Sequence, residues 1–356
     1  MPKNDYQFVL ELFREDRSSV GRALVSVDWE PAVEWAEFEE MRHGQLPPVF
    51  GVTGCAVEPI WQEEVGEPVV KGFCLAFSSK NGRAANPAPL RSQAFDTTYF
   101  EASVAAAYAN FRDANVLKAE EKVSYQVLAF VHEEGNQTSE ENSIFDTEDV
   151  AQTLVLLPSS LSAARSVATK TGELPEELLP AFVPATLLEE IAELSRAAEA
   201  KETGGILIGH LHRDEDGAEI FATVTTQIPA QYTEAELMKL TFTSETWTDV
   251  RNALQLRRRD EIMLGWWHSH PARAWCKDCS VESQRQCPYA RGFLSSHDRG
   301  LHRTMFSRAY SLALVVNDVG FAPPSFSLFG WKGGGIVERD FYIVDGGVNA
   351  EGESKN

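Results

Sequence analysis

The sequence predicts a mixed α/β protein that is divided into two domains. Its 356 residues suffice for about two domains of roughly 150 residues each. Short apolar runs of strand length alternate with segments of helical spacing along the whole chain, which indicates sheets covered by helices. Residues 171–186 carry one glycine and three prolines, a composition that favours a domain boundary.

We therefore assign residues 1–170 to a first mixed α/β domain and residues 174–345 to a second, and we expect a disordered tail over 346–356. The first domain holds no metal-ligand spacing and no nucleophile motif, so its role stays unknown. Docking of a partner or substrate is our hypothesis for it. Its expected strands are 23–28, 49–59, 68–77, 125–132 and 153–157, its helices 32–41 and 99–116, and its loops 79–94 and 133–149.

The second domain begins with a helix from about residue 187, whose leucines and isoleucine fall on one face and whose glutamates fall on the other. The glycine pair at 204 and 205 ends this helix and starts a strand. The expected strands are 206–209, 220–224, one ending at 268, 311–316, 325–329 and 340–344, and a further helix is expected over 244–256.

The composition excludes several classes of function. The chain carries 53 Asp and Glu against 32 Lys and Arg, a formal net charge of -21, which repels a phosphate backbone and excludes nucleic acid as a partner. No window approaches 18 continuous apolar residues and the polar start lacks an apolar signal core, so we expect a cytoplasmic protein without a membrane segment. The five cysteines, an odd number, suit a reducing compartment.

Two histidines, His268 and His270, follow an apolar run of strand length. Side chains at positions i and i+2 of a strand point to the same face, so both rings can reach one metal ion. Asp298 supplies the kind of third ligand that catalytic zinc sites use, with a fourth position left for water.

Two further residues complete a hydrolytic site. Ser295 and Asp298 have the spacing of a helix capping box, and Asp298 in the first turn can still direct its carboxylate to the metal. Glu202 lies at a helix-to-strand junction, where its side chain can project into the same cleft and serve as a proton acceptor.

Residues 202–209, 265–271 and 293–298 therefore present a glutamate, then His-x-His-Pro, then Ser-x-x-Asp. In this order the elements resemble the JAMM (MPN-plus, JAB) metallopeptidase pattern, and the resemblance covers about residues 174–345. It implies a mixed α/β fold with helices flanking a curved sheet, related to the cytidine-deaminase-like folds.

The same resemblance implies roles for single residues. His268, His270 and Asp298 would be zinc ligands, Glu202 the general acid/base, and Ser295 a donor to the tetrahedral intermediate. The family cleaves isopeptide or peptide bonds after the C-terminus of ubiquitin or ubiquitin-like proteins. Composition and motif suggest a bacterial protein, and bacterial members act beside ubiquitin-like proteins with their activating and conjugating enzymes.

One insertion departs from the family pattern. Between Pro271 and Ser295 lie 23 residues, where typical members have fewer than ten. The insertion holds three cysteines of the kind that bind structural zinc, which needs four ligands. The expected set is Cys276, Cys279 and Cys287, with His302 as first choice for the fourth ligand and His297 as second.

Two other functions fit the motifs less well. A zinc deaminase would need a glutamate where His270 stands, and its Cys-x-x-Cys would lie farther from the histidine. A non-catalytic MPN-like scaffold would lack the ligand set, which this chain keeps. A zinc metallo-isopeptidase of the JAMM type is therefore our prediction.

Overall fold

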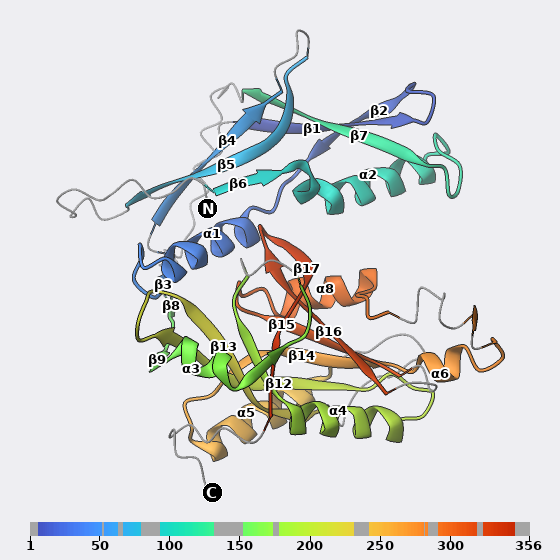
Figure 1. Cartoon of the computed structure of the whole chain (residues 1–356). Helices are drawn as coiled ribbons and strands as arrows, with labels where there is room; N and C mark the ends of the chain where they lie inside the picture. The colour runs from blue at the N-terminus through green and yellow to red at the C-terminus, as the bar shows by residue number, and fades with distance from the viewer. Residues whose placement is uncertain are drawn as a thin grey trace, which may run out of the picture. The chain divides into compact units, whose positions relative to one another are not determined.

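The structure of the protein is a computed structural model. In it the chain forms two compact units (Figure 1). Unit 1 comprises Met1–Glu40, Gln45–Leu154 and Gly333–Gly335, and unit 2 comprises Met41–Gly44, Val155–Lys332 and Ile336–Asn356. The structure describes residues 6–51, 53–62, 67–79, 93–131, 152–173, 178–230, 242–280, 282–283, 291–318 and 323–345.

Unit 1 is built on a six-stranded antiparallel sheet with the order β2-β1-β7-β5-β4, and β6 pairs with β5. The helices α1 (Glu30–Arg42) and α2 (Glu101–Asp113) accompany it, and a short 3-10 helix, Thr97–Phe100, precedes α2. The strands are β1 (Tyr6–Arg14), β2 (Ser19–Val25), β4 (Thr53–Trp61), β5 (Val69–Ser79), β6 (Gln93–Asp96) and β7 (Val123–Val131), beside a separate pair, β3 (Val49–Phe50) and β8 (Gln152–Thr153).

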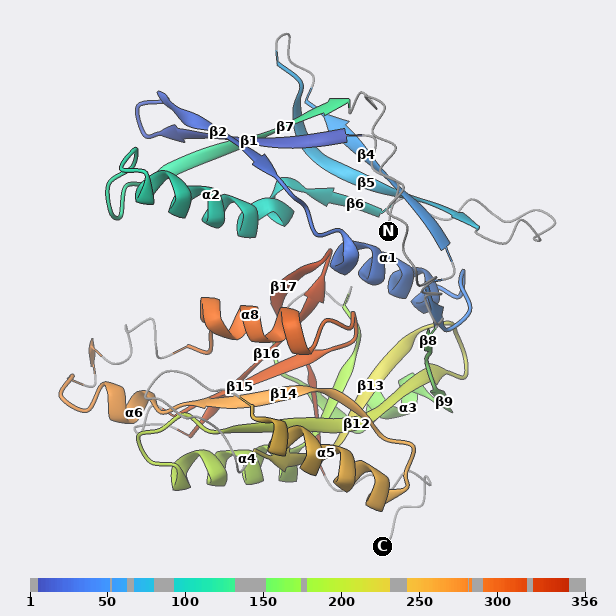
Figure 2. The ribbon, with the colours of Figure 1, turned by 180° about the vertical axis from the view of Figure 1, so that it is seen from behind.

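The core of unit 1 lies between this sheet and its helices. Alternation along β1 sends Phe8, Leu10 and Leu12 into an apolar cluster with Trp29 and residues of the other central strands. Figure 2 shows α2 running along one face of the sheet. The hydrophobic period of two in β1 therefore fixes which face of the sheet is covered.

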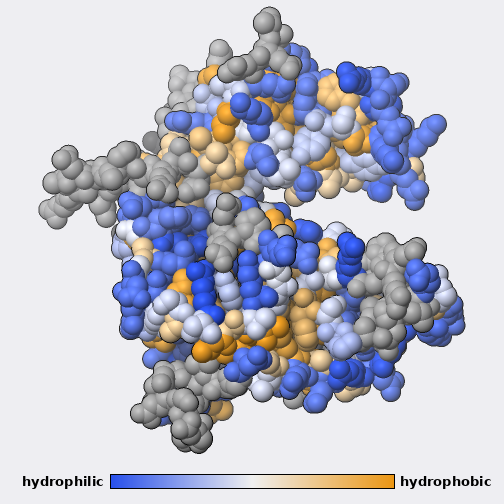
Figure 3. Space-filling view, in the orientation of Figure 1, coloured by the Kyte–Doolittle hydropathy of each residue, from blue (hydrophilic) through white to orange (hydrophobic). Residues whose placement is uncertain are grey.

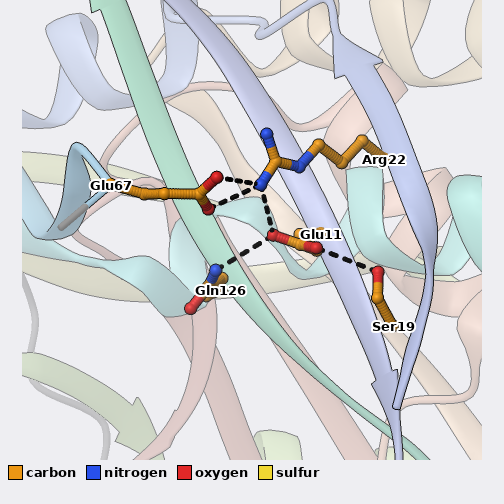
Figure 4. Close-up of polar contacts among 5 residues, drawn as sticks. All are labelled: Glu11, Ser19, Arg22, Glu67 and Gln126. Carbon is orange, nitrogen blue, oxygen red and sulfur yellow. Dashed lines mark hydrogen bonds and ion pairs between the residues drawn. The ribbon is translucent and has the colours of Figure 1, made fainter.

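On the opposite face, Glu11 links three neighbouring strands (Figure 4). Its carboxylate accepts hydrogen bonds from Ser19 at 2.9 Å and from Arg22 and Gln126 at 3.1 Å each, and Arg22 also pairs with Glu67. Burial alone would raise the pKa of Glu11, but these three donors outweigh it and lower the pKa. The buried charge is thus fully compensated by its cross-strand neighbours.

Unit 2 contains a ten-stranded mixed sheet with the order β10-β18-β11-β13-β12-β14-β15-β16-β17, and β9 pairs with β12. The pairs β10–β18, β13–β12, β12–β14 and β15–β16 are antiparallel, whereas β14–β15, β11–β13, β11–β18 and β9–β12 are parallel. The strands are β9 (Leu156–Ser159), β10 (Ala168–Lys170), β11 (Ala181–Pro184), β12 (Gly204–Asp214), β13 (Ile220–Pro229), β14 (Ile262–His270), β15 (Leu312–Asn317), β16 (Ser325–Lys332), β17 (Gly335–Arg339) and β18 (Tyr342–Val344).

Helices cover both faces of the centre of this sheet (Figures 1 and 2). On one face, Trp267 of β14 donates to Gln227, which in turn donates to Glu190 of α4 (Ala185–Ala197). On the other face, Trp266 donates to His302 of α8 (Ser296–Met305). This unit also contains α3 (Leu161–Ser166), α5 (Ser244–Arg257) and α6 (Ala272–Trp275). Because consecutive tryptophans point to opposite faces, β14 is buried on both sides.

The division between the units lies near residue 154, earlier than the sequence placed it. β9 pairs with β12 and β10 pairs with β18, so residues 155–170 belong to the second sheet. The expected linker 171–186 contains β11, whose Ala181, Phe182 and Val183 are buried between β13 and β18. The prolines therefore flank or end a central strand at this position.

The expected strands 49–59 and 153–157 are each divided, into β3 and β4 and into β8 and β9, and these parts lie in different sheets. The expected helices agree with the structure to within a few residues. The helices predicted at 32–41, 99–116, 187 onward and 244–256 correspond to α1, α2, α4 and α5. The expected tail 346–356, the loop 133–149 and most of the loop 79–94 lie outside the described residues.

The visible surface in Figure 3 is mainly hydrophilic, with hydrophobic residues gathered in limited areas. Leu24 and Leu256 are among the large apolar side chains that are exposed. None of the helices among the described residues is both long and apolar enough to cross a membrane.

Candidate metal centre

The centre is built on β14, where the side chains of Trp266, His268 and His270, every second residue of the strand, lie on one face. All three side chains are buried, with exposed fractions of 2% or less. Gly265 permits this packing, because a Cβ at that position would collide with the backbone carbonyl of Leu312 on β15. The close approach of the two parallel strands therefore sets the position of both histidines.

Three potential ligand atoms converge beside this strand. The Nε2 atoms of His268 and His270 lie 3.1 Å apart, and Asp298 Oδ2 lies 3.7 Å from His268 Nε2. The ligand atoms of these three residues all lie within 4.8 Å of one another. Among the described residues, no other group of three or more His, Cys, Asp or Glu side chains meets in this way.

Asp298 reaches the histidines from the first turn of α8. The backbone N–H of Ser295 donates to Asp298 Oδ2 at 2.8 Å, and the hydroxyl of Ser295 accepts from the backbone N–H of Asp298 at 3.2 Å. This is a complete capping box. The motif that starts the helix therefore also fixes the Asp298 carboxylate. In the capping box Ser295 Oγ acts only as an acceptor, so the Ser295 O–H can still donate a hydrogen bond to another partner.

Glu202 lies one residue before Thr203, which hydrogen bonds fix to Ser269 of β14. Ser269 N–H donates to the carbonyl of Thr203 at 2.8 Å, and Thr203 N–H donates to Ser269 Oγ at 3.0 Å. Glu202 is 5% exposed. Burial, together with the negative charge of Asp298, raises the pKa of Glu202 to about 8. A buried carboxyl that favours its protonated form beside a carboxylate is typical of an acid/base site.

Gly205, the second glycine after Glu202, has a steric reason. A Cβ at Gly205 would lie 2.6 Å from Trp267 Nε1 and 2.5 Å from the carbonyl of Ile228. β12, which begins two residues after Glu202, can therefore pack against β14 only with glycine at position 205.

Aromatic rings surround the histidines. Trp266 stacks on His268 with 4.7 Å between ring centroids, while Phe293 and Trp275 contact His270 at 4.6 Å and 5.4 Å. Burial lowers the pKa of His268 to about 3, and burial together with His268 lowers that of His270 to about 3. Both rings are therefore neutral near pH 7 and offer a lone pair to a ligand.

The donor set fits a divalent cation. Two neutral imidazoles and one carboxylate are the three protein ligands of a catalytic zinc site with an open fourth position. The Nδ1 atoms of His268 and His270 have no hydrogen-bond partner among the described residues. Each ring can thus carry its proton on Nδ1 and leave Nε2 for the metal.

The expected second zinc set is only partly visible. Cys276 is buried and Cys279 is exposed, and Cys279 N–H donates to the carbonyl of Cys276 at 2.9 Å. Cys287 lies outside the described residues. His302 is fully buried and accepts the indole N–H of Trp266 at Nδ1, and it does not join the two cysteines in a three-residue group. His297 is exposed.

Sequence reasoning missed several neighbours of the centre, among them Ser269, His302 in its contact with Trp266, and Asn317 beside His270 in the sheet. The signal for Ser269 was available, because it lies between the two histidines on the opposite face. The roles of His302 and Asn317 depend on strand and helix pairing that sequence spacing alone does not give.

Comparison with known proteins supports a relationship to the JAB/MPN family for part of the chain. Residues 184–274 match the family of prokaryotic homologs of the JAB domain. This segment contains Glu202, His268 and His270 and ends before Asp298. The JAB family includes metalloproteases as well as non-catalytic members. The match is thus consistent with a JAMM-like hydrolase or with an MPN-like scaffold.

No curated protein matches the chain. Among solved structures, the solution structure of protein DSY2949 from Desulfitobacterium hafniense is similar, with 19% identity and a TM-score of 0.32, and the match covers 49% of this chain and 99% of that one.

Proposed function

We propose that unit 2 is a zinc-dependent hydrolase of the JAMM type that cleaves an amide bond. The observation that carries this proposal is the convergence of His268, His270 and Asp298 within 4.8 Å, beside the buried Glu202. A scaffold has no need to keep two neutral histidines, a carboxylate and a second, protonatable carboxyl in one buried place.

The residues of the site would have distinct roles in this reaction. His268, His270 and Asp298 would hold zinc, which when bound polarises a carbonyl and acidifies water. Glu202, which a dication bound beside it would favour as the carboxylate, would take a proton from the attacking water and return it to the leaving amine. The Ser295 hydroxyl would donate a hydrogen bond to the carbonyl oxygen of the substrate, which gains negative charge in the tetrahedral intermediate.

The substrate class that we propose is a ubiquitin-like protein, cut at its C-terminus from a conjugate or a precursor. The support is the spacing of glutamate, His-x-His-Pro and Ser-x-x-Asp together with the partial match to the JAB family. Activating and conjugating enzymes for that protein would be further partners. Unit 1 would dock the partner or the substrate.

A deaminase is disfavoured by the arrangement of the ligands. His270 occupies the ligand face where a deaminase needs its glutamate. In addition, Cys276 and Cys279 are not part of the three-residue group at the centre.

The proposal is tested by zinc analysis and by hydrolysis of ubiquitin carrying a C-terminal aminocoumarin amide and of isopeptide-linked diubiquitin. We expect zinc in the wild type, and we expect Glu202→Gln to retain it while losing at least about 100-fold in rate. Glu193→Gln, a change on the exposed side of α4, is the matched control and should leave both unchanged. A zinc-free wild type, or normal turnover by Glu202→Gln, would contradict the proposed site.

A further inference from the structure

Asn317, the last residue of β15, is fully buried, yet neither its Nδ2 nor its Oδ1 has a hydrogen-bond partner among the described residues. A buried amide without partners loses the hydrogen bonds that it makes with water in the unfolded chain. Such a residue in a packed sheet therefore points to a partner that completes it.

The sheet places Asn317 beside a proposed metal ligand. In the parallel pairing of β14 with β15, His270 is opposite Asn317 and His268 is opposite Val315. Paired residues of neighbouring strands project from the same face. Asp318 N–H donates to the carbonyl of His270 at 3.1 Å, so the two strand ends are fixed at this register.

His270 itself lacks a partner on one side of its ring. Its Nε2 faces His268 Nε2 at 3.1 Å, whereas its Nδ1 is buried with no hydrogen-bond partner among the described residues. The rings of Phe293 and Trp275 contact the imidazole, and they offer no strong acceptor. Val315, beside His268, is apolar. Asn317 is thus the polar member of the two β15 side chains that are paired with the histidines.

We propose that Asn317 is a positioning residue of the metal centre, whose Oδ1 accepts the N–H of His270 Nδ1. This inference rests on the proposed zinc site. A histidine that binds metal through Nε2 must carry its proton on Nδ1, and an acceptor for that proton fixes both the tautomer and the ring orientation. Rotation of the Asn317 amide would satisfy two buried groups that each lack a partner.

The experiment measures the zinc affinity of the full chain by competition with a chromophoric chelator. Asn317→Leu has nearly the same shape but no acceptor, and we expect about 10- to 100-fold weaker zinc binding. Asn317→Asp keeps the acceptor and should stay within about threefold of the wild type. Ser325→Ala alters the exposed residue that pairs with Asn317 on β16 and should have no effect.

Two measurements separate this role from a purely structural one. Thermal unfolding of the metal-free proteins should show Asn317→Leu at least as stable as the wild type, because an apolar side chain replaces an unsatisfied amide. Long-range nitrogen–proton NMR of the zinc-loaded wild type should show His270 protonated at Nδ1, and this measurement needs no variant.

The outcomes are distinguishable. A wild type that binds no zinc would remove the proposed function itself. A wild type that binds zinc, with equal affinity in Asn317→Leu or with His270 protonated at Nε2, would overturn only the role of Asn317.

Discussion

The indole of Trp266 lies almost parallel to the imidazole of His268, with 14° between the ring planes, and its N–H donates to His302 Nδ1 at 3.0 Å. Through this hydrogen bond α8 fixes the Trp266 indole ring, and His268, a proposed metal ligand, packs against the face of that ring. His302 is thereby connected to the metal centre without being part of the ligand group.

The first prediction concerns His302. Replacing it with Leu leaves the buried indole N–H without an acceptor, and we expect a loss of about 1–3 kcal/mol in the free energy of unfolding, measured by urea titration of the metal-free protein. His302→Gln retains an acceptor and is the matched control. Equal unfolding free energies of the wild type and His302→Leu would show that the hydrogen bond from Trp266 to His302 does not stabilise the fold.

The second prediction is a pH dependence that arises at His212, far along β12 from the centre. Burial, with a smaller contribution from His210, lowers the pKa of His212 to about 4. In the unfolded chain a histidine titrates near 6.5, so between these values the unfolded state binds the extra proton. The stability contribution is therefore complete above about pH 6.5 and is lost as the pH falls towards 4.

His212→Gln removes this titration and can still bond to the hydroxyl of Thr223, which lies 2.7 Å from His212 Nε2. The drop in unfolding free energy from pH 7.5 to pH 5.5 should be smaller in this variant by about 1 kcal/mol. The same change at the exposed His43 serves as the control. Identical pH profiles for His212→Gln and the wild type would rule out the buried neutral ring.

The third prediction concerns the cysteine insertion, for which we propose a structural zinc. The hydrogen bond from Cys279 N–H to the carbonyl of Cys276 closes a turn between the two cysteines of the Cys-x-x-Cys. A Cys276→Ser/Cys279→Ser double variant should lose one zinc per chain and keep the one at the His268 centre. Two zinc ions remaining in the double variant would refute the second site.

The fourth prediction follows from the boundary near residue 154. A chain that begins at residue 155 keeps β9 and β10 and should fold and bind zinc, whereas one that begins at 171 removes both strands from the sheet and should be less stable. Thermal unfolding compares the two. Since unit 1 is our proposed docking unit, the longer fragment should cleave the aminocoumarin amide of ubiquitin normally and isopeptide-linked diubiquitin more slowly. Equal rates on both substrates would remove the docking role.

Much of the fold and centre followed from local patterns in the sequence. Alternation in β14 predicted that His268 and His270 share a face, and the Ser-x-x-Asp spacing predicted the capping box that the structure shows at Ser295 and Asp298. The meeting of these side chains is seen in the structure, and zinc binding and hydrolysis remain predictions.

The rest required tertiary pairing. β11 was hidden because Pro180 and Pro184 have the composition of a linker, while burial of Phe182 makes the segment a central strand. β1 was missed because its apolar residues also fit an amphipathic segment. An asparagine at the end of an apolar strand is typical of the start of a loop. Only the pairing of Asn317 with His270 across β14 and β15 indicates a role at the centre.

The capping box at Ser295 and Asp298 has a consequence for how the proposed zinc ion would be acquired. Helix α8 starts, and its carboxylate is aimed, by hydrogen bonds that involve no metal. Small zinc domains are unfolded until the ion arrives, but here the ligands are preformed. If the proposed zinc site is correct, the protein would lose and regain the ion without refolding, and in a cell the zinc supply would control how many molecules are active while their abundance stays constant.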